Sequence, residues 1–175
     1  MPDGSREQRF QALFDASFDD LTRFVRRRIR EGDDVVAETY LVAWRSLEQV
    51  PLGEGEGRAW LFTVAHNLMA NQRRKDARLV AWEPSDVPSE DEFEAADTRI
   101  DLSRAFSRLS PEDQEVLALV VWEGLTSAQA ASVLSITARA FRVRLHRARR
   151  RLRVGMHRPH SAPTPILRSS YDVPR

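Results

Sequence analysis

The amino-acid sequence predicts an all-α protein in which a flexible acidic linker joins two small helical domains. Long stretches almost free of proline and glycine carry apolar residues at every third or fourth position, which is typical of amphipathic helices. No segment alternates apolar and polar residues as a half-buried strand does. Between the helical stretches, residues 79–103 hold eight acidic side chains against Arg99 alone. A segment of that composition buries too little apolar surface to fold by itself.

The composition excludes several classes of protein. The chain of 175 residues has no cysteine, so we expect no disulfide, no thiolate metal site and no cysteine nucleophile. No apolar run approaches the ~20 residues of a membrane span, and the first residues lack the apolar core of a secretory signal. The four histidines show no metal-ligand spacing with carboxylates, and no glycine-rich loop has the phosphate-binding pattern. We therefore expect a cytoplasmic protein that is not an enzyme, has no catalytic residue, metal or cofactor, and does not contact a membrane.

The first domain is expected at residues 6–76, with three helices. The first helix is predicted over about 6–30, the second from Asp33, where two acids suit a first turn, and the third over about 58–75. The glycine-rich segment 51–57 should form a loop. The residues expected to face the core are Phe10, Phe14, Leu21, Val25, Val36, Ala37, Tyr40, Leu41, Trp44, Leu47, Trp60, Leu61, Val64, Ala65 and Leu68.

The linker is expected at residues 77–99, the second domain at 100–154 and a disordered tail at 155–175. Within the second domain a helix should begin at Ser110, a good N-cap, followed by Pro111 at the first helical position. It should end near Gly124, because glycine suits a left-handed C-terminal residue.

A helix-turn-helix outline follows. Thr126 and Gln129 fit a capping box that opens a short helix to Leu134. Three residues then separate it from a long helix that runs to about Val154. The buried stripe of this helix is expected to be Phe141, Leu145, Ala148 and Leu152. A short helix, a tight turn and an arginine-rich helix together are typical of a DNA-binding helix-turn-helix.

Charge singles out the long helix, which holds eight arginines between Arg139 and Arg153 without one acid. Like charges at this spacing destabilise an isolated helix, so the helix favours an external anion. In a major groove its early turns would reach base edges and its later arginines phosphates. The alternatives are a solvated basic helix or one that binds an acidic protein.

Two weaker patterns lie in the first domain. Asn67 and Asn71 continue a polar stripe beside Trp60, which suits unpaired bases but also an ordinary outer face. Asp34 and Glu38 form an acidic pair on one helical face and, taken alone, are equally an ordinary surface pair.

Three segments in order resemble conserved regions of bacterial sigma factors of the extracytoplasmic-function group. Residues 33–45 (DDVVAETYLVAWR) resemble the second conserved region, and residues 58–74 resemble its promoter-melting helix. Residues 109–112, 123–126 and 144–152 are similar to the fourth region. The resemblance spans about 8–76 and 100–153. It implies a sigma region 2 domain of three to four helices and a helix-turn-helix region 4 domain.

The resemblance also implies function: binding of core RNA polymerase through the β′ clamp and β flap, and promoter-specific initiation. It implies that promoter DNA is read as duplex at −35 and as a single strand at −10, and it makes an anti-sigma factor a candidate partner. The implied core-polymerase residues are Asp34, Glu38, Tyr40 and Leu41. The implied −10 residues are Trp60, Asn67, Asn71, Arg73 and Arg74. The implied −35 residues are Arg139, Arg142, Val143, His146, Arg147 and Arg149.

The sequence departs from the family pattern at four places. Ala37 stands where glutamine is frequent, Ser135 where the turn has glycine, and Val143 where serine is common. The loop 50–57 lacks the usual aromatic residue. Two other functions stay open at this point: a DNA-binding regulator that acts without polymerase, and an interaction module that sequesters a protein partner.

Overall fold

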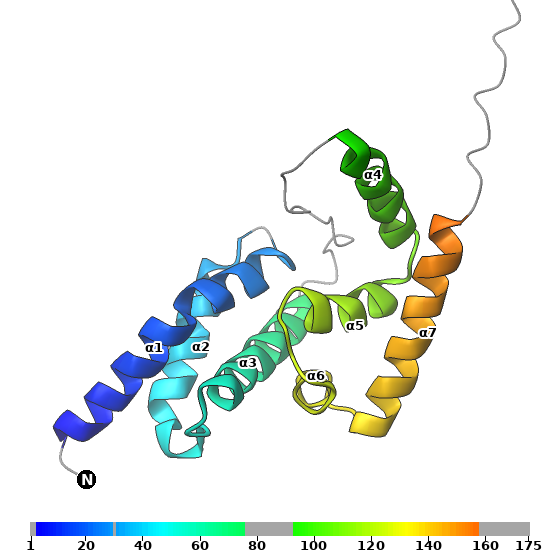
Figure 1. Ribbon diagram of the computed structural model, residues 1–175. Coiled ribbons are helices and arrows are strands. Elements are labelled where there is room, and N and C mark those ends of the chain that lie inside the picture. Colours follow the sequence, from blue (N-terminus) through cyan, green and yellow to red (C-terminus); the bar gives the residue numbers. More distant parts are fainter. Residues whose placement is uncertain (1–2, 30, 76–92, 158–175) are drawn as a thin grey trace, which may run out of the picture.

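The computed structural model describes residues 3–29, 31–75 and 93–157, and within these ranges every regular element is helical (Figure 1). The elements are α1 (Asp3–Arg26), α2 (Asp33–Arg45), the short 3-10 helix η1 (Leu47–Gln49), α3 (Glu54–Lys75), α4 (Phe93–Ser107), α5 (Pro111–Val121), α6 (Ser127–Val133) and α7 (Ala138–Met156). The predicted all-α class is confirmed. The expected linker up to residue 92 and the expected tail from residue 158 lie outside the described residues.

Helices α1, α2 and α3 pack pairwise and form the first half of the molecule. Aromatic side chains fill the space between α1 and α2, where the rings of Phe14 and Tyr40 lie 4.7 Å apart. The buried Tyr40 hydroxyl shares a 2.9 Å hydrogen bond with Ser17. Between α1 and α3, the rings of Phe24 and Phe62 stack with centroids 4.4 Å apart. Such contacts place α2 and α3 at fixed positions on α1.

The boundaries of two helices differ from the prediction. Helix α1 ends at Arg26, four positions before the expected residue 30, because the chain turns there and Gly32 packs against Val25. A Cβ at Gly32 would lie 2.3 Å from Val25 Cγ1, so this close approach needs glycine. Helix α3 begins at Glu54, inside the segment expected to be a loop. Gly57 is held against Leu13, and this tertiary contact overrides its low helix propensity.

Of the fifteen residues predicted for the core of the first half, seven are buried, six are half-buried and two are exposed. Ala37 and Leu41 are exposed, with Leu41 55% accessible, whereas Val35, Thr39 and Ala43 are buried. The buried α2 stripe therefore has the expected width but is rotated by one residue, or about 100° around the helix axis, from the predicted one. On α3, Trp60, Val64 and Leu68 are only half-buried, and the buried Phe62 and Met69 complete the core instead.

In the second half, α4 and α5 both pack against α7. Helix α4 begins at Phe93, inside the segment expected to be linker. The sequence between Pro88 and Pro111 contains no proline or glycine, so helix formation there meets no backbone obstacle. Gly155 of α7 lies against α4, where a Cβ would come within 3.2 Å of Ala105.

The predicted caps of the second half are confirmed. Ser110 Oγ accepts a hydrogen bond from the Asp113 backbone N–H, and Gly124 adopts a φ of +63°. Thr126 and Gln129 form both bonds of the capping box. Helix α7 runs to Met156, two positions past the expected end.

The two halves share one core. Helix α3 lies against α6, and a single cluster of buried apolar residues continues from α1–α3 into α5–α7 (Figure 1). Local sequence patterns give no indication of this contact.

Candidate nucleic-acid interface

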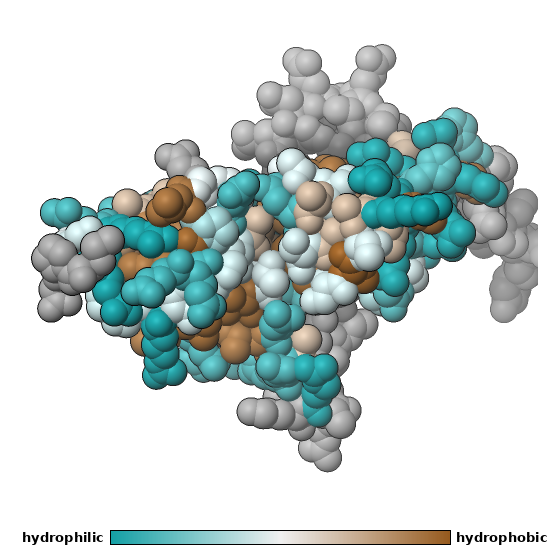
Figure 2. All heavy atoms as spheres, turned by 90° about the horizontal axis from the view of Figure 1, so that it is seen from below, coloured by the Kyte–Doolittle hydropathy of each residue, from teal (hydrophilic) through white to brown (hydrophobic). Residues whose placement is uncertain are grey.

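Helix α7 presents an exposed basic face, named here the recognition face. Its residues are Arg139, Arg142, Val143, His146, Arg147 and Arg149, all of which are exposed as expected. On the opposite side of the helix Phe141, Leu145 and Ala148 are buried. Hydrophilic residues gather at the end of the molecule where α7 lies (Figure 2). The face therefore offers guanidinium groups, without a neighbouring acid on the same helix, to an external polyanion.

The turn before α7 fixes the direction of the recognition face. Ser135 has a φ of +53°, so the turn keeps a left-handed residue although no glycine stands there. Ile136 donates its backbone N–H to Ala131, 3.0 Å away, which holds the turn against α6. Thr137 caps α7 by accepting a bond from the Ala140 backbone N–H. This is the geometry by which a helix-turn-helix projects its second helix into a major groove.

Two arginines of α7 serve other contacts. Arg151 donates to Asp113 of α5 over 2.5 Å and so ties α7 to the second-half core. Arg144 lies near Glu112, whose pKa is lowered, first by a hydrogen bond from its own backbone, then by Ser110 and by the charge of Arg144. The eight arginines are therefore not equivalent, and Arg151 contributes to the fold.

Helix α3 carries the residues expected to read the −10 strand. Asn67, Asn71 and Arg74 are exposed, and Trp60 is half-buried near the start of the helix. Arg74 donates to the amide oxygen of Asn71, which holds the two side chains together. The side chain of Arg73 lies outside what the structure describes. Amides and an arginine on one exposed stripe suit the free edges of unpaired bases.

Helix α2 carries the expected polymerase contacts, and the structure separates them. Asp34, Glu38 and Leu41 are exposed, so they can meet a partner together. Tyr40 is only 6% exposed, and burial raises the pKa of its hydroxyl above the usual value near 10, against the smaller opposing effect of the Ser17 bond. Tyr40 therefore lies beneath this exposed face, in the packed interface between α1 and α2.

Sequence reasoning missed a group of charged residues that joins the two halves, named here the interdomain cluster. Its members are Arg27, Arg28 and Arg58 of the first half and Glu115 and Glu123 of the second. Each residue is unremarkable in its local sequence. Only the run Arg26-Arg27-Arg28 at the end of a helix is an unusual signal, because arginines there can serve a distant carboxylate.

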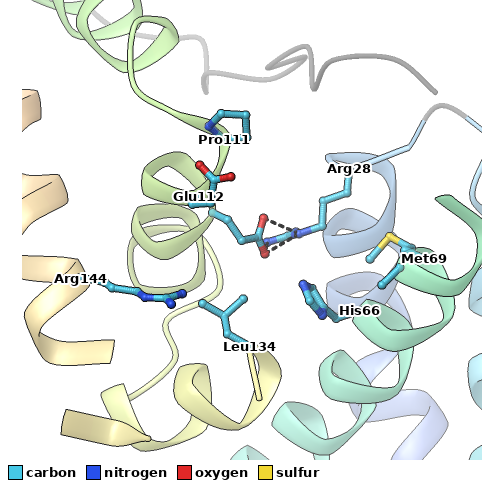
Figure 3. Close-up of a pocket in the computed structure, with 9 residues that line it drawn as sticks. Arg28, His66, Met69, Pro111, Glu112, Leu134 and Arg144 are labelled. Carbon is cyan, nitrogen blue, oxygen red and sulfur yellow. Dashed lines mark hydrogen bonds and ion pairs between the residues drawn. The ribbon is translucent and has the colours of Figure 1, made fainter. Parts of the chain in front are cut away.

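A cavity of about 280 Å³ lies beside the interdomain cluster. Arg28, His66 and Met69 line it from the first half, and Leu134 and Arg144 from the second (Figure 3). Among the described residues, no three potential ligand side chains gather as a metal site would require. In the same part of the chain, no helix has the length and apolar character needed to cross a membrane.

Comparisons with known proteins give one family match in each half of the molecule. The models of Sigma-70 region 2 and Sigma-70 region 4 match residues 13–79 and 99–152. The chain is 34% identical over 154 residues to an ECF RNA polymerase sigma factor, SigL of Mycobacterium tuberculosis, covering 82% of this chain and 86% of the relative. It is 31% identical over 137 residues to the RNA polymerase sigma factor CnrH of Cupriavidus metallidurans, covering 69% and 70% of the two chains.

Two solved structures resemble this fold. The structure of CnrH in complex with the cytosolic domain of CnrY gives a TM-score of 0.54 at 24% identity, over 83% of this chain and 85% of that chain. The sigma factor RpoE of Bartonella quintana, solved with the anti-sigma factor NepR, gives 0.55 at 23% identity, over 89% and 98%. At these identities the likeness supports the fold.

Proposed function

The chain belongs to the extracytoplasmic-function sigma factors of bacterial RNA polymerase, and from that membership and the geometry above we propose which surface carries each step of promoter recognition. A sigma factor of this kind binds core RNA polymerase and directs promoter-specific initiation by recognising −35 duplex and −10 single-stranded DNA. It is a transcription specificity factor, and we propose that it has no catalytic activity of its own.

The recognition face of α7 is proposed to read the −35 element. The observation that supports this most is the union of a helix-turn-helix with an exposed arginine face free of acids. Arg142, His146 and Arg147 lie in the middle turns and are assigned to base edges. Arg139 and Arg149 are assigned to flanking phosphates, and the exposed apolar Val143 to a thymine methyl group.

The −10 strand is assigned to α3. Asn67 and Asn71 would hydrogen-bond to the edges of unpaired bases, and Arg74 would hold Asn71 in place or contact a phosphate. Trp60 is half-buried, so one part of its ring can stack on a base while the rest packs on the fold. Arg73 belongs to this set through the resemblance of residues 58–74 to the promoter-melting helix of the family.

The exposed face of α2 is assigned to the β′ clamp of core polymerase. Asp34 and Glu38 supply two carboxylates on one face, and Leu41 supplies an exposed apolar contact next to them. Tyr40 is proposed to position this face. The β flap of core polymerase would bind the region 4 domain, as the family resemblance implies.

The remaining assignments follow from the same membership. We propose a region 2 domain at 6–76, a linker at 77–99, a region 4 domain at 100–154 with α4 reaching into the linker, and a tail at 155–175. The protein would act in the cytoplasm, at the nucleoid when bound to polymerase. An anti-sigma factor is a candidate partner, because the related RpoE was solved with one.

Holoenzyme assembly tests this function. Purified protein is mixed with core polymerase, and the complex is tested on −35 duplex and on forked −10 DNA. The proposal expects co-elution with polymerase and binding of both DNAs by the complex. DNA binding without co-elution would instead indicate a regulator that acts without polymerase, and binding of neither would indicate a sequestering module.

A further inference from the structure

We propose that Arg6 and Arg9 of α1 are positioning residues for −10 recognition, because they hold the chain that leads into α3 and so fix the direction of Trp60. Both arginines lie before residues 13–79, the segment that matches the region 2 model, so the family match does not include them. The proposal rests on the assignment of α3 to the −10 strand.

One face of α1 contacts the junction between α2 and α3. Arg6, Arg9 and Leu13 are three and four positions apart and therefore share a face of the helix, named here the anchor face. They contact, in turn, the end of α2, the end of η1 and the first turn of α3. The beginning of α1 lies at the same end of the molecule as this junction (Figure 1).

Arg6 binds the end of α2. Its guanidinium donates to the backbone carbonyl of Trp44 over 2.8 Å and lies over the Trp44 ring, 4.9 Å from the centroid. The last carbonyls of an α-helix have no partner within the helix, and the helix dipole favours a cation there. The ring of Phe10 meets the same indole edge-on, with centroids 5.2 Å apart. These contacts fix the end of α2 to α1.

Arg9 binds the chain between η1 and α3. The half-buried Arg9 side chain donates to the carbonyl of Val50 over 2.5 Å. A hydrogen bond from a charged donor is stronger than one between neutral groups. One turn further along α1, Leu13 packs against Gly57, where a Cβ would lie 3.3 Å from Leu13 Cδ1. The anchor face thus contacts the chain on both sides of the segment 51–56.

The first turn of α3 needs support from its neighbours. Glycine occupies positions 53, 55 and 57, and glycine is an unfavourable residue in a helix. The Gly53 carbonyl accepts backbone bonds from Glu56 at 3.1 Å and from Gly57 at 2.7 Å. Gln129 of the second half donates to the Gly55 carbonyl over 3.2 Å, whereas the anchor face supports this turn from within the region 2 domain itself.

Trp60 depends most on this turn among the residues assigned to the −10 strand. It follows Gly57 by three positions, which is about one helical turn. Asn67 and Asn71 lie in later turns of α3. Loss of the anchor face should therefore redirect the Trp60 ring while the −35 face of α7 and the acidic pair at the start of α2 keep their positions.

Binding of forked −10 DNA by the complex with core polymerase measures the effect. Arg9→Met keeps most of the aliphatic stem but has no donor, so the affinity should fall by about three-fold or more. Arg9→Lys keeps a cationic donor and should restore most of the affinity. Arg23→Met is the matched control, because Arg23 lies on α1 and bonds to Asp20 of the same helix. Binding of polymerase and of −35 duplex should be unchanged in all three variants.

A double-mutant cycle with Trp60 separates positioning from a general loss of stability. Trp60→Ala alone should lose about five-fold or more, as expected for a base that stacks on an aromatic ring. If Arg9 acts through Trp60, adding Arg9→Met to Trp60→Ala should cause no further loss. Losses that multiply, or full affinity in Arg9→Met alone, would overturn the positioning role. Full affinity in Trp60→Ala would overturn the assignment of Trp60 to the −10 strand, and this proposal with it.

Hydrogen exchange of the free protein tests the anchor face without DNA or polymerase. In Arg9→Met the backbone amides of residues 53–57 should exchange about three-fold faster or more, while those of α7 exchange as in the unmutated protein. Arg6→Met removes a second contact of the same face and should give the same pattern, so the test does not depend on one variant. Unchanged exchange at residues 53–57 in both variants would overturn the proposal while leaving the proposed function in place.

Discussion

The guanidinium of Arg28 lies 3.1 Å from the carboxylate of Glu123, although 95 residues separate the two in the chain. Both side chains are almost fully buried, and Glu115 provides Arg28 with a second carboxylate. A buried charge that loses its partner is costly, so the two halves of the molecule stabilise each other's charged residues only while they remain in contact.

Base-reading and phosphate-contacting arginines on α7 should respond differently to truncation. Arg142→Ala and Arg147→Ala should each cost ~1–3 kcal/mol on a matched −35 duplex and relax specificity. Arg150 is an exposed later arginine of the same helix, where phosphate contacts are expected, so Arg150→Ala should mainly lower the salt dependence by about one ion. Fluorescence anisotropy over a salt series, on matched and scrambled duplexes, measures both quantities. Equal losses on both duplexes would show that Arg142 and Arg147 contact only phosphates.

Charge reversal on α2 should weaken polymerase binding without changing the fold. Asp34→Arg with Glu38→Arg would place cations where the proposed clamp contact needs anions, and loss of such pairs costs ~2–5 kcal/mol, or at least ~30-fold in affinity. Glu48→Arg, an exposed reversal on η1, is the matched control and should bind normally. Unchanged binding by the double variant in a pull-down would remove α2 from the interface.

Glycine at the helix-turn-helix turn should stabilise the protein. Ser135 has a φ of +53°, a conformation that costs an L-residue ~1–2 kcal/mol. Glycine relieves this strain, but its unfolded chain has more conformational entropy to lose on folding, which offsets part of the stabilisation. Ser135→Gly should therefore raise the free energy of unfolding by about 0.5–1 kcal/mol. Ser132→Gly, in the exposed face of α6, should lower it by about 0.5 kcal/mol. Urea unfolding compares the two, and a loss of stability in Ser135→Gly would contradict the strain at this turn.

Alkaline pH should weaken the packing of α1 on α2. Burial raises the pKa of the Tyr40 hydroxyl above its usual value near 10. Since the folded pKa exceeds the unfolded one, the contribution of Tyr40 to stability is complete below about pH 10 and is lost as pH rises through the folded pKa. Tyr40→Phe should remove this part of the pH dependence.

Absorbance at 295 nm follows the titration directly, because the chain has only two tyrosines. One of them should ionise above pH 10, and Tyr40→Phe should abolish that step. A Tyr40 that titrates at or below pH 10 would contradict its burial.

Local signals in the sequence predict much of the fold. The N-caps at Ser110 and Thr126 and the left-handed Gly124 are present, each from residues within a few positions of one another. Of the expected α7 stripe, Phe141, Leu145 and Ala148 are buried and Leu152 is half-buried. The same reasoning is wrong at Leu41, because α2 has apolar residues on adjoining faces and tertiary packing decides which of them is buried. It also missed the start of α3, where a tertiary contact at Gly57 decides the conformation.

In the candidate site too, local patterns predict some features and miss a contact between residues far apart in the chain. Exposure of Arg142, His146 and Arg147 follows from the period of α7 and was predicted. Burial of Tyr40 was expected from the α2 stripe, although the family resemblance also placed it among the partner contacts. The bond between Arg28 and Glu123 joins residues far apart in the chain, and no periodicity or cap relates them.

Run-off transcription with purified core polymerase tests promoter-directed initiation most directly. The account predicts discrete transcripts whose mapped start sites lie downstream of a shared −35 and −10 pair, and their loss when Arg142 and Arg147 are both replaced by alanine. A protein that binds core polymerase and promoter duplex yet yields no specific transcript, or transcripts that persist unchanged in that double variant, would contradict it.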